Sequence, residues 1–181
     1  MYRSRKNPQI SLKPQDLVVL LRLSLAKDAM PAYAVLGGEL GMTASEVHAA
    51  LERARAARLV RKEPARAPVL LRDALLQFVL HGAPYAFPAV RGEATRGFPT
   101  AYAAAPLRER VAQPAAEPSP VWPHREGSVR GVALYPLYPS VPDAARRNPA
   151  LYELLALFDA LRAGAARERK LASELLAERL A

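Results

Sequence analysis

The chain has 181 residues, enough for one or two small domains with a hydrophobic core, and 51% of them are hydrophobic. It contains no cysteine, which excludes a disulfide framework and a thiolate metal site and suits a reducing compartment. The formal net charge is +9, from 26 Lys and Arg against 17 Asp and Glu. Such a charge favours an acidic partner, nucleic acid before anionic membrane, unless it only reflects an arginine-rich and alanine-rich composition.

The N-terminal segment gives no sign of secretion or of a membrane span. Residues 1–12 are a basic arm without the apolar core of a signal peptide. The apolar run from Leu17 to Ala26 is short and is interrupted by Arg22, whereas a spanning helix needs about 20 apolar residues. We therefore expect a cytoplasmic protein with no membrane partner.

Two helices are predicted before the first left-handed turn. Pro14 is compatible with a first helical turn, and the apolar run after it predicts a helix to Ala26 that is buried on most sides. Residues 32–40 predict a second, shorter helix, although two glycines inside it each cost about 1 kcal/mol of helix stability. Gly41 then supplies the left-handed residue that commonly ends helices.

A third helix, over residues 43–57, has a complete start signal. Thr43 and Glu46 have the spacing of a capping box, and Met42 and Val47 that of a hydrophobic staple. Apolar residues then recur at helical spacing and predict one buried side; they are Val47, Ala50, Leu51 and Ala54. The opposite side is small, polar or basic. Residues 59–61 follow as a short strand and 62–66 as a turn.

This order of elements, carried by the run LGGELGMTASEVHAALERARAARLVRK, resembles the winged helix-turn-helix of bacterial transcriptional regulators of the MarR-like kind, over residues 13–71. The resemblance implies that helix 43–57 lies in the major groove of double-stranded DNA and that the wing touches backbone or minor groove. The residues that it places at or near DNA are Thr43, Ser45, His48, Ala49, Glu52, Arg53, Arg55, Arg58, Arg61, Lys62 and Arg66.

Several details of this segment remain open in the sequence. Only residues 66–69 are available for a second wing strand, which contains Pro68, so the wing is expected to be short or degenerate. Glu52 is unusual on a DNA-facing side unless it accepts from a cytosine amino group or pairs with Arg53 or Arg55. The arginines fit phosphate or base contacts but also a solvated helix face, and we expect their removal to leave the fold intact. His48 fits a base contact or an ordinary surface position.

Residues 68–81 predict a further helix, and the segment after it changes character. Its expected core positions are Leu70, Leu71, Ala74, Leu75, Phe78 and Val79. Residues 83–142 hold most of the prolines and aromatic residues, which predicts an ordered but irregular segment packed on the helices. Residues 112–120 are expected to be a loose loop and 128–135 a strand. The aromatic residues expected to dock are Tyr85, Phe87, Phe98, Tyr102, Trp122, Tyr135 and Tyr138.

Residues 143–181 predict two C-terminal helices. Asn148 and Pro149 give a cap and a first turn for a helix that ends before Gly164. A last helix over 165–180 carries a stripe of leucines that would serve dimerisation; these are Leu171, Leu175, Leu176 and Leu180.

The fold class expected from these patterns is mainly α, with a winged helix-turn-helix domain over 13–82, an irregular segment over 83–142 and C-terminal helices over 143–181. The expected function is transcriptional regulation by a homodimer that binds double-stranded DNA. The alternative is an antitoxin-like component that binds a partner protein through residues 82–181.

The sequence offers little for catalysis. It has no phosphate-binding glycine loop, HExxH or GxSxG pattern, and its three histidines are far apart, so we expect no enzyme activity, no cofactor and no metal. The aromatic run of Trp122 and residues 135–139 fits a ligand pocket, but structural docking fits it as well. Arginines of the same segment could line an anion pocket in an enzyme, or simply be solvated; they are Arg91, Arg96, Arg108, Arg125 and Arg130.

Overall fold

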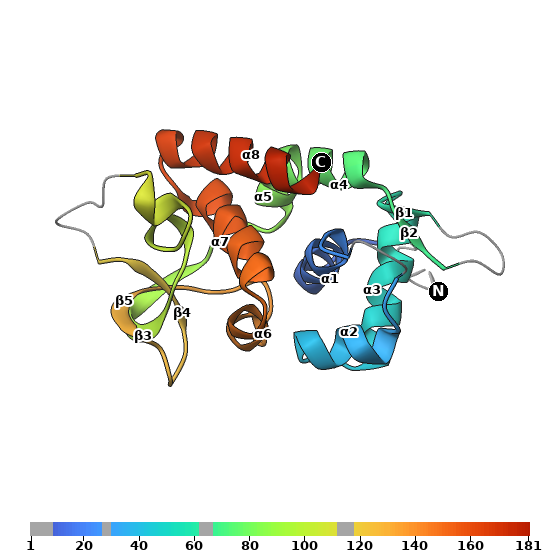
Figure 1. Cartoon of the computed structure of the whole chain (residues 1–181), viewed down its shortest axis with the longest axis horizontal. Coiled ribbons are helices and arrows are strands. Elements are labelled where there is room, and N and C mark those ends of the chain that lie inside the picture. The colour runs from blue at the N-terminus through green and yellow to red at the C-terminus, as the bar shows by residue number, and fades with distance from the viewer. Residues whose placement is uncertain (1–8, 27–29, 62–66, 112–117) are drawn as a thin grey trace, which may run out of the picture.

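The computed structural model describes residues 9–26, 30–61, 67–111 and 118–181. Within these ranges the chain is mainly helical, with eight α-helices and two small sheets. Helices α1 to α3 and the β1–β2 pair, all within residues 14–70, lie at one end of the molecule. Strands β3 to β5, within residues 91–134, lie at the other end, and helices α6 and α7, within residues 141–163, lie between them (Figure 1). The expected mainly α class is confirmed.

The three N-terminal helices form where the sequence predicts them. Helix α1 spans Pro14–Ser24, α2 spans Tyr33–Leu40 and α3 spans Ala44–Ala56. Gly41 ends α2 with a φ of 66°, in the left-handed region that glycine adopts without strain. Gly37 also serves the fold, because a Cβ there would lie 2.5 Å from the carbonyl oxygen of Met42.

A two-residue antiparallel pair follows α3. Strand β1 (Val60–Arg61) pairs with β2 (Val69–Leu70), with Val60 opposite Leu70. The helix predicted from Pro68 is therefore wrong at its start, since residues 69–70 complete the ladder and α4 spans only Arg72–His81. Residues 62–66 between the strands, including Lys62 and Arg66, lie outside the described residues.

The segment 83–142 is more regular than predicted. After α5 (Ala83–Ala86), strands β3 (Arg91–Pro99), β4 (Pro120–Pro123) and β5 (Val129–Leu134) close into a small three-stranded sheet, with short 3-10 turns at Ala101–Ala103 and Leu107–Glu109. The strand predicted over 128–135 is confirmed as β5. The loop predicted over 112–120 falls mostly outside the described residues, and its last residue, Pro120, begins β4.

The aromatic residues of this segment divide into two groups. Trp122, Phe87 and Tyr102 are buried, and Phe98 and Tyr138 are partly buried, as predicted. The prediction is wrong for the other two, because the exposed fraction is 84% for Tyr85 and 49% for Tyr135.

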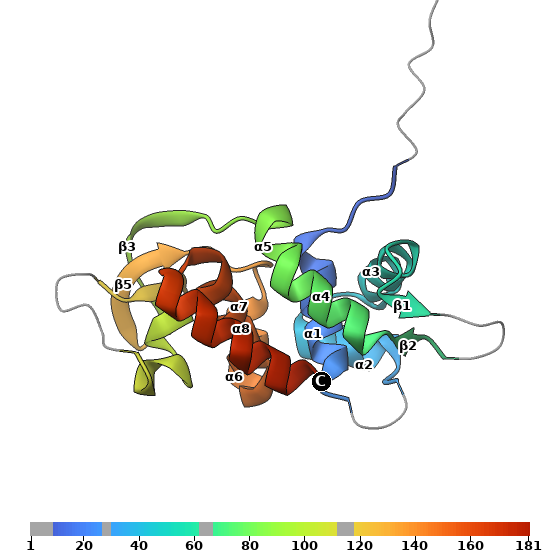
Figure 2. The same cartoon turned by 90° about the horizontal axis from the view of Figure 1, so that it is seen from above.

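The C-terminal helices cover the centre of the molecule. Helix α6 spans Val141–Arg147, α7 Pro149–Ala163 and α8 Ala166–Leu180. The cap predicted for α7 is confirmed, since the Asn148 side chain accepts a hydrogen bond from the Leu151 amide at 3.1 Å. Helix α8 lies across α7 and beside α4 (Figure 2). Leu175, Leu176 and Leu180 are buried by these contacts within one chain and Leu171 is partly buried, so the leucine stripe predicted for dimerisation packs inside the chain.

A buried polar cluster fastens α7 to the small sheet. The Asp159 carboxylate accepts hydrogen bonds from the Thr100 hydroxyl at 2.7 Å and the Trp122 indole at 2.6 Å. It also pairs with Arg162 at 2.8 Å, and Arg162 donates to the carbonyl oxygen of Tyr135. Burial raises the pKa of Asp159, and the charge of Arg162 opposes that shift. The Trp122 ring is thus part of the core rather than of an aromatic ligand pocket.

Candidate nucleic-acid interface

Helix α3 separates a buried side from an exposed side. The apolar stripe predicted for it, which includes Val47 and Leu51, is buried among α1 and α2. Thr43, Ser45 and His48 are exposed on the other side, where Ala49 and Glu52 are half-buried. No other described element covers this exposed side, so a partner has access to it.

The start of α3 is fixed by the predicted capping box. The Thr43 amide donates to the Glu46 carboxylate at 2.7 Å, and the Glu46 amide donates to the Thr43 hydroxyl at 3.2 Å. The Tyr138 hydroxyl donates to the same carboxylate at 3.0 Å. The bonds from Thr43, and then that from Tyr138, lower the pKa of Glu46, while the bond to Glu46 raises the pKa of Tyr138. The loop before α6 therefore holds the first turn of α3.

Arg53 has a structural role that the sequence did not reveal. Its guanidinium makes two hydrogen bonds to the Asp16 carboxylate, at 2.8 and 2.7 Å, and the exposed fraction of the Asp16 side chain is only 1%. This bond raises the pKa of Arg53 further. This pairing favours a supporting role for Arg53 over a DNA contact. Contrary to the expectation from the sequence that its loss leaves the fold intact, we expect the loss to destabilise the fold, because the buried Asp16 carboxylate would lose its cation and keep the hydrogen bond from the Lys13 amide.

Arg55 and Glu52 form an exposed ion pair one turn apart on α3. The distance between guanidinium and carboxylate is 3.0 Å. This is one of the two arrangements that the sequence allowed for Glu52, and it partly neutralises the acidic charge on the exposed side. Arg55 is 52% exposed, so a phosphate could compete with Glu52 for its guanidinium.

Arg58 stands at the end of α3 in a left-handed conformation, with a φ of 60°. Its amide donates to the carbonyl oxygen of Arg55 at 3.0 Å, and the Leu59 amide donates to the carbonyl oxygen of Ala54 at 2.9 Å. These two hydrogen bonds end the helix. The side chain is exposed and extends from the helix end that leads into β1. Arg61 is exposed on β1, so two basic side chains flank the helix on this side.

His48 lies against the aromatic ring of Tyr33 from α2, with 5.7 Å between the ring centroids. Both residues belong to the surface formed by α2 and α3. The ring contact fixes where the imidazole lies while leaving the residue exposed.

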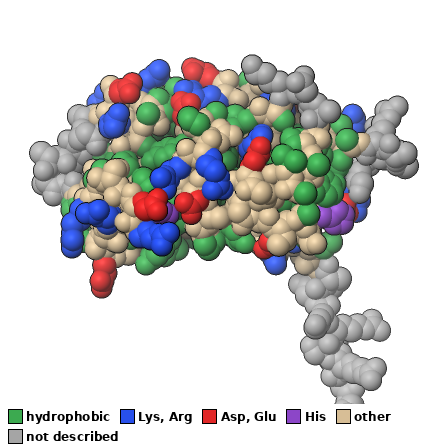
Figure 3. Space-filling view, turned by 60° about the horizontal axis from the view of Figure 1, so that its bottom comes forward, with side chains coloured by type: hydrophobic (Ala, Val, Ile, Leu, Met, Phe, Trp, Pro, Cys, Tyr) green, Lys and Arg blue, Asp and Glu red, His purple; other side chains and the backbone are tan. Residues whose placement is uncertain are grey.

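The arginines of the segment after α4 do not form an anion pocket. All five are exposed, on β3, β5, the turn at 107–109 and the loop before β5. On the neighbouring surface basic and acidic side chains alternate (Figure 3). Near this segment Arg146 pairs with Glu126 at 2.7 Å, and His124 lies 3.3 Å from Asp143. This arrangement gives no support to an enzyme site in this segment.

Two partners of the α3 surface were missed at the sequence level. Asp16 stands in the first turn of α1, where an acidic residue is ordinary because it complements the helix dipole. Tyr138 lies 92 positions from its partner Glu46. Neither position carries a local pattern that points to α3, so no sequence signal was available for either contact.

The described part of the chain contains no group of three or more metal-ligating side chains. No helix among the described residues is both long enough and apolar enough to cross a bilayer. Comparison with known proteins finds no family model, no curated protein and no solved structure that matches this chain.

Proposed function

We propose that this chain is a bacterial, cytoplasmic transcriptional regulator that binds double-stranded DNA, with α3 as the recognition helix in the major groove. The observation that carries the proposal is the two-sided character of α3: its aliphatic side is locked against α1 and α2, while small, polar and basic side chains stand exposed on the other. A recognition helix needs both properties, a rigid attachment and short polar side chains that can reach base edges.

The surroundings of α3 support the same proposal. Arg55, Arg58 and Arg61 are exposed along the helix and the adjoining strand, where they can neutralise phosphates. The β1–β2 pair stands beside the helix, in the place where a short wing would reach the backbone. The net charge of +9 has the sign that attraction to a polyanion requires.

Within this proposal the contacts to bases come from Thr43, Ser45, His48 and Ala49, and the contacts to phosphate from Arg55, Arg58 and Arg61. A homodimer would place two copies of α3 in successive major grooves, with half-sites about one helical turn apart. Leu175, Leu176 and Leu180 of α8 are buried within the chain, so we expect such a dimer to use another surface.

A gel-shift or fluorescence titration against the upstream DNA of the chain's own gene, at two salt concentrations, tests the proposal. We expect Arg55→Ala and Arg58→Ala each to weaken binding and to lower the slope of log K against log salt by about 1, as the loss of one phosphate contact predicts. Arg130→Ala, which removes the same charge from β5, is the matched control and should leave the affinity and the slope nearly unchanged. Equal affinities for all these variants would refute the assignment of α3.

A second function, binding of a partner protein through residues 82–181, is favoured by exposed apolar side chains on that part. Tyr85, Val90 and Tyr135 are exposed, and the Tyr135 amide donates to the carbonyl oxygen of Val90 at 2.9 Å, so two of them adjoin. Stable co-purification of a second protein that Tyr85→Ser and Tyr135→Ser release would support this function. A homodimer that binds DNA tightly without any second protein would count against it.

A further inference from the structure

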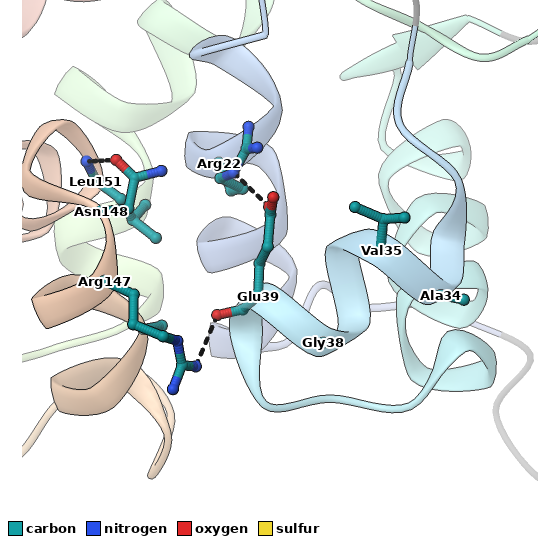
Figure 4. A pocket seen from close by; sticks show the side chains of 9 residues that line it. Arg22, Ala34, Val35, Gly38, Glu39, Arg147, Asn148 and Leu151 are labelled. Carbon is teal, nitrogen blue, oxygen red and sulfur yellow. Dashed lines mark hydrogen bonds and ion pairs between the residues drawn. The ribbon is translucent and has the colours of Figure 1, made fainter.

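A cavity of about 410 Å³ lies between α2 on one side and the α6–α7 junction on the other (Figure 4). Its apolar wall is formed by Ala34 and Val35 of α2 and by Ala144 and Leu151 of α6 and α7. The volume is within the range of about 300–1,000 Å³ that is typical of small-molecule sites. Val35 is 52% exposed, although it is a large apolar residue in a helix that packs on its neighbours.

The polar groups of the cavity carry one net positive charge. Arg22 and Glu39 neutralise each other through an ion pair of 2.7 Å. Arg147 donates one hydrogen bond, to the backbone carbonyl oxygen of Glu39 at 2.9 Å, and no acidic side chain of the described residues pairs with it. Next to it the Asn148 side chain uses its oxygen to cap α7 and makes no hydrogen bond through its amide nitrogen within the described chain. A guanidinium and an amide, at different places on the α6–α7 side, thus supply unused donors in an apolar cavity (Figure 4).

The glycine at position 38 supports a ligand site independently of the polar groups. It lies in the interior of α2, where glycine costs about 1 kcal/mol relative to alanine. A Cβ at Gly38 would meet no atom within 4 Å, so the packing of the chain does not require glycine there. Its neighbour Gly37 is different, because the backbone at Met42 leaves no room for a Cβ. Gly38 lines the cavity, and the missing side chain keeps that wall open to whatever enters it.

From these features we propose that the cavity binds a small monocarboxylate with a short apolar body. The carboxylate would lie on the Arg147 guanidinium, whose planar fork matches it. The apolar body would lie over Gly38 and against Val35 and Leu151. A doubly charged phosphate fits less well, because only Arg147 is unpaired and the charge of Arg22 is neutralised by Glu39.

The test uses the full-length, isotope-labelled protein and follows its backbone amide signals by NMR without DNA, so that its outcome is separate from that of the DNA-binding proposal. The probes are hexanoate and benzoate, with hexanamide and benzamide as uncharged controls and inorganic phosphate as a competing anion. We expect the two carboxylates to shift the amides of Gly38, Arg147 and Leu151, and the uncharged amides to bind at least about tenfold more weakly.

Two variants and two controls make the result specific. Gly38→Leu fills the cavity and should abolish the shifts, whereas Gly38→Ala keeps most of the space and should retain them while raising the melting temperature. Arg147→Gln should weaken hexanoate binding about tenfold, and Arg130→Gln should not change it. The proposal is overturned if neither carboxylate shifts these signals, if hexanamide binds as well as hexanoate, if phosphate alone binds, or if Gly38→Leu still binds.

Discussion

At the scale of single residues, the pair formed by Arg53 and Asp16 decides how α3 is held against α1. The carboxylate is almost fully buried, so removal of the cation leaves an uncompensated charge in the interior. We expect Arg53→Ala to lower the free energy of unfolding by about 3 kcal/mol, and Asp16→Ala by a similar amount. Urea unfolding followed by circular dichroism measures both.

The neighbouring exposed arginine provides the control for this pair. Arg55 also has an acidic partner, Glu52, but that pair is largely solvated, and Arg55→Ala should change stability by less than about 0.5 kcal/mol. Equal losses for Arg53→Ala and Arg55→Ala would contradict the structural role of Arg53. The two arginines stand two positions apart, yet one belongs to the interior and the other to the surface.

Arg58 combines an unfavourable backbone with an exposed charge. A non-glycine residue in the left-handed region is strained by roughly 1 kcal/mol, and a helix end of this kind favours glycine. We expect Arg58→Gly to raise the free energy of unfolding by about that amount and to weaken DNA binding. If Arg58→Gly raises the free energy of unfolding but lowers the affinity for DNA, the charge of Arg58 serves binding at a cost in stability. A variant that gains stability and binds DNA as before would remove Arg58 from the interface.

At the scale of elements, α8 contributes to the core of one chain. Leu175, Leu176 and Leu180 are buried against α7 and α4, so truncation creates a cavity inside the chain. We expect Leu176→Ala to cost about 2–5 kcal/mol in urea unfolding and to leave the oligomeric state of the folded protein unchanged by sedimentation. A variant that changed the oligomeric state without a loss of stability would return α8 to the role of a dimer interface.

The helices of this chain are easier to predict from the sequence than its strands. Helix α3 has a cap, a staple and a stripe of period 3.6, and each is a local signal that the structure reproduces. Strand β3 (RGEATRGFP) has two glycines and no alternation of apolar and polar residues, because it lies in a small sheet where backbones approach closely. At Gly97 a Cβ would collide with the backbone of Trp122, a requirement visible only once both strands are placed.

At the scale of the whole molecule, the N-terminal helices and the C-terminal part share one hydrophobic core that runs from α1 to α8. Contacts of residues far apart in sequence hold the turn between α2 and α3. The Ser140 hydroxyl donates to the carbonyl oxygen of Leu40, and Arg147 donates to that of Glu39. Helix α2 contributes to both proposed sites, because its Tyr33 contacts His48 of α3 and its Val35 and Gly38 line the cavity.

The sequence by itself determined the mainly α class, the N-terminal helices with their turn at Gly41, the capped start of α3, strand β5 and both C-terminal helices. These features depend on interactions within a few residues, which the order of side chains records directly. Only the tertiary structure decided which arginine of α3 is buried, where the leucines of α8 pack, that β2 precedes α4, and that β3 to β5 close into a sheet. Those outcomes depend on contacts with residues tens of positions away in the sequence. A local pattern does not indicate which distant side chain will pack against a given buried residue.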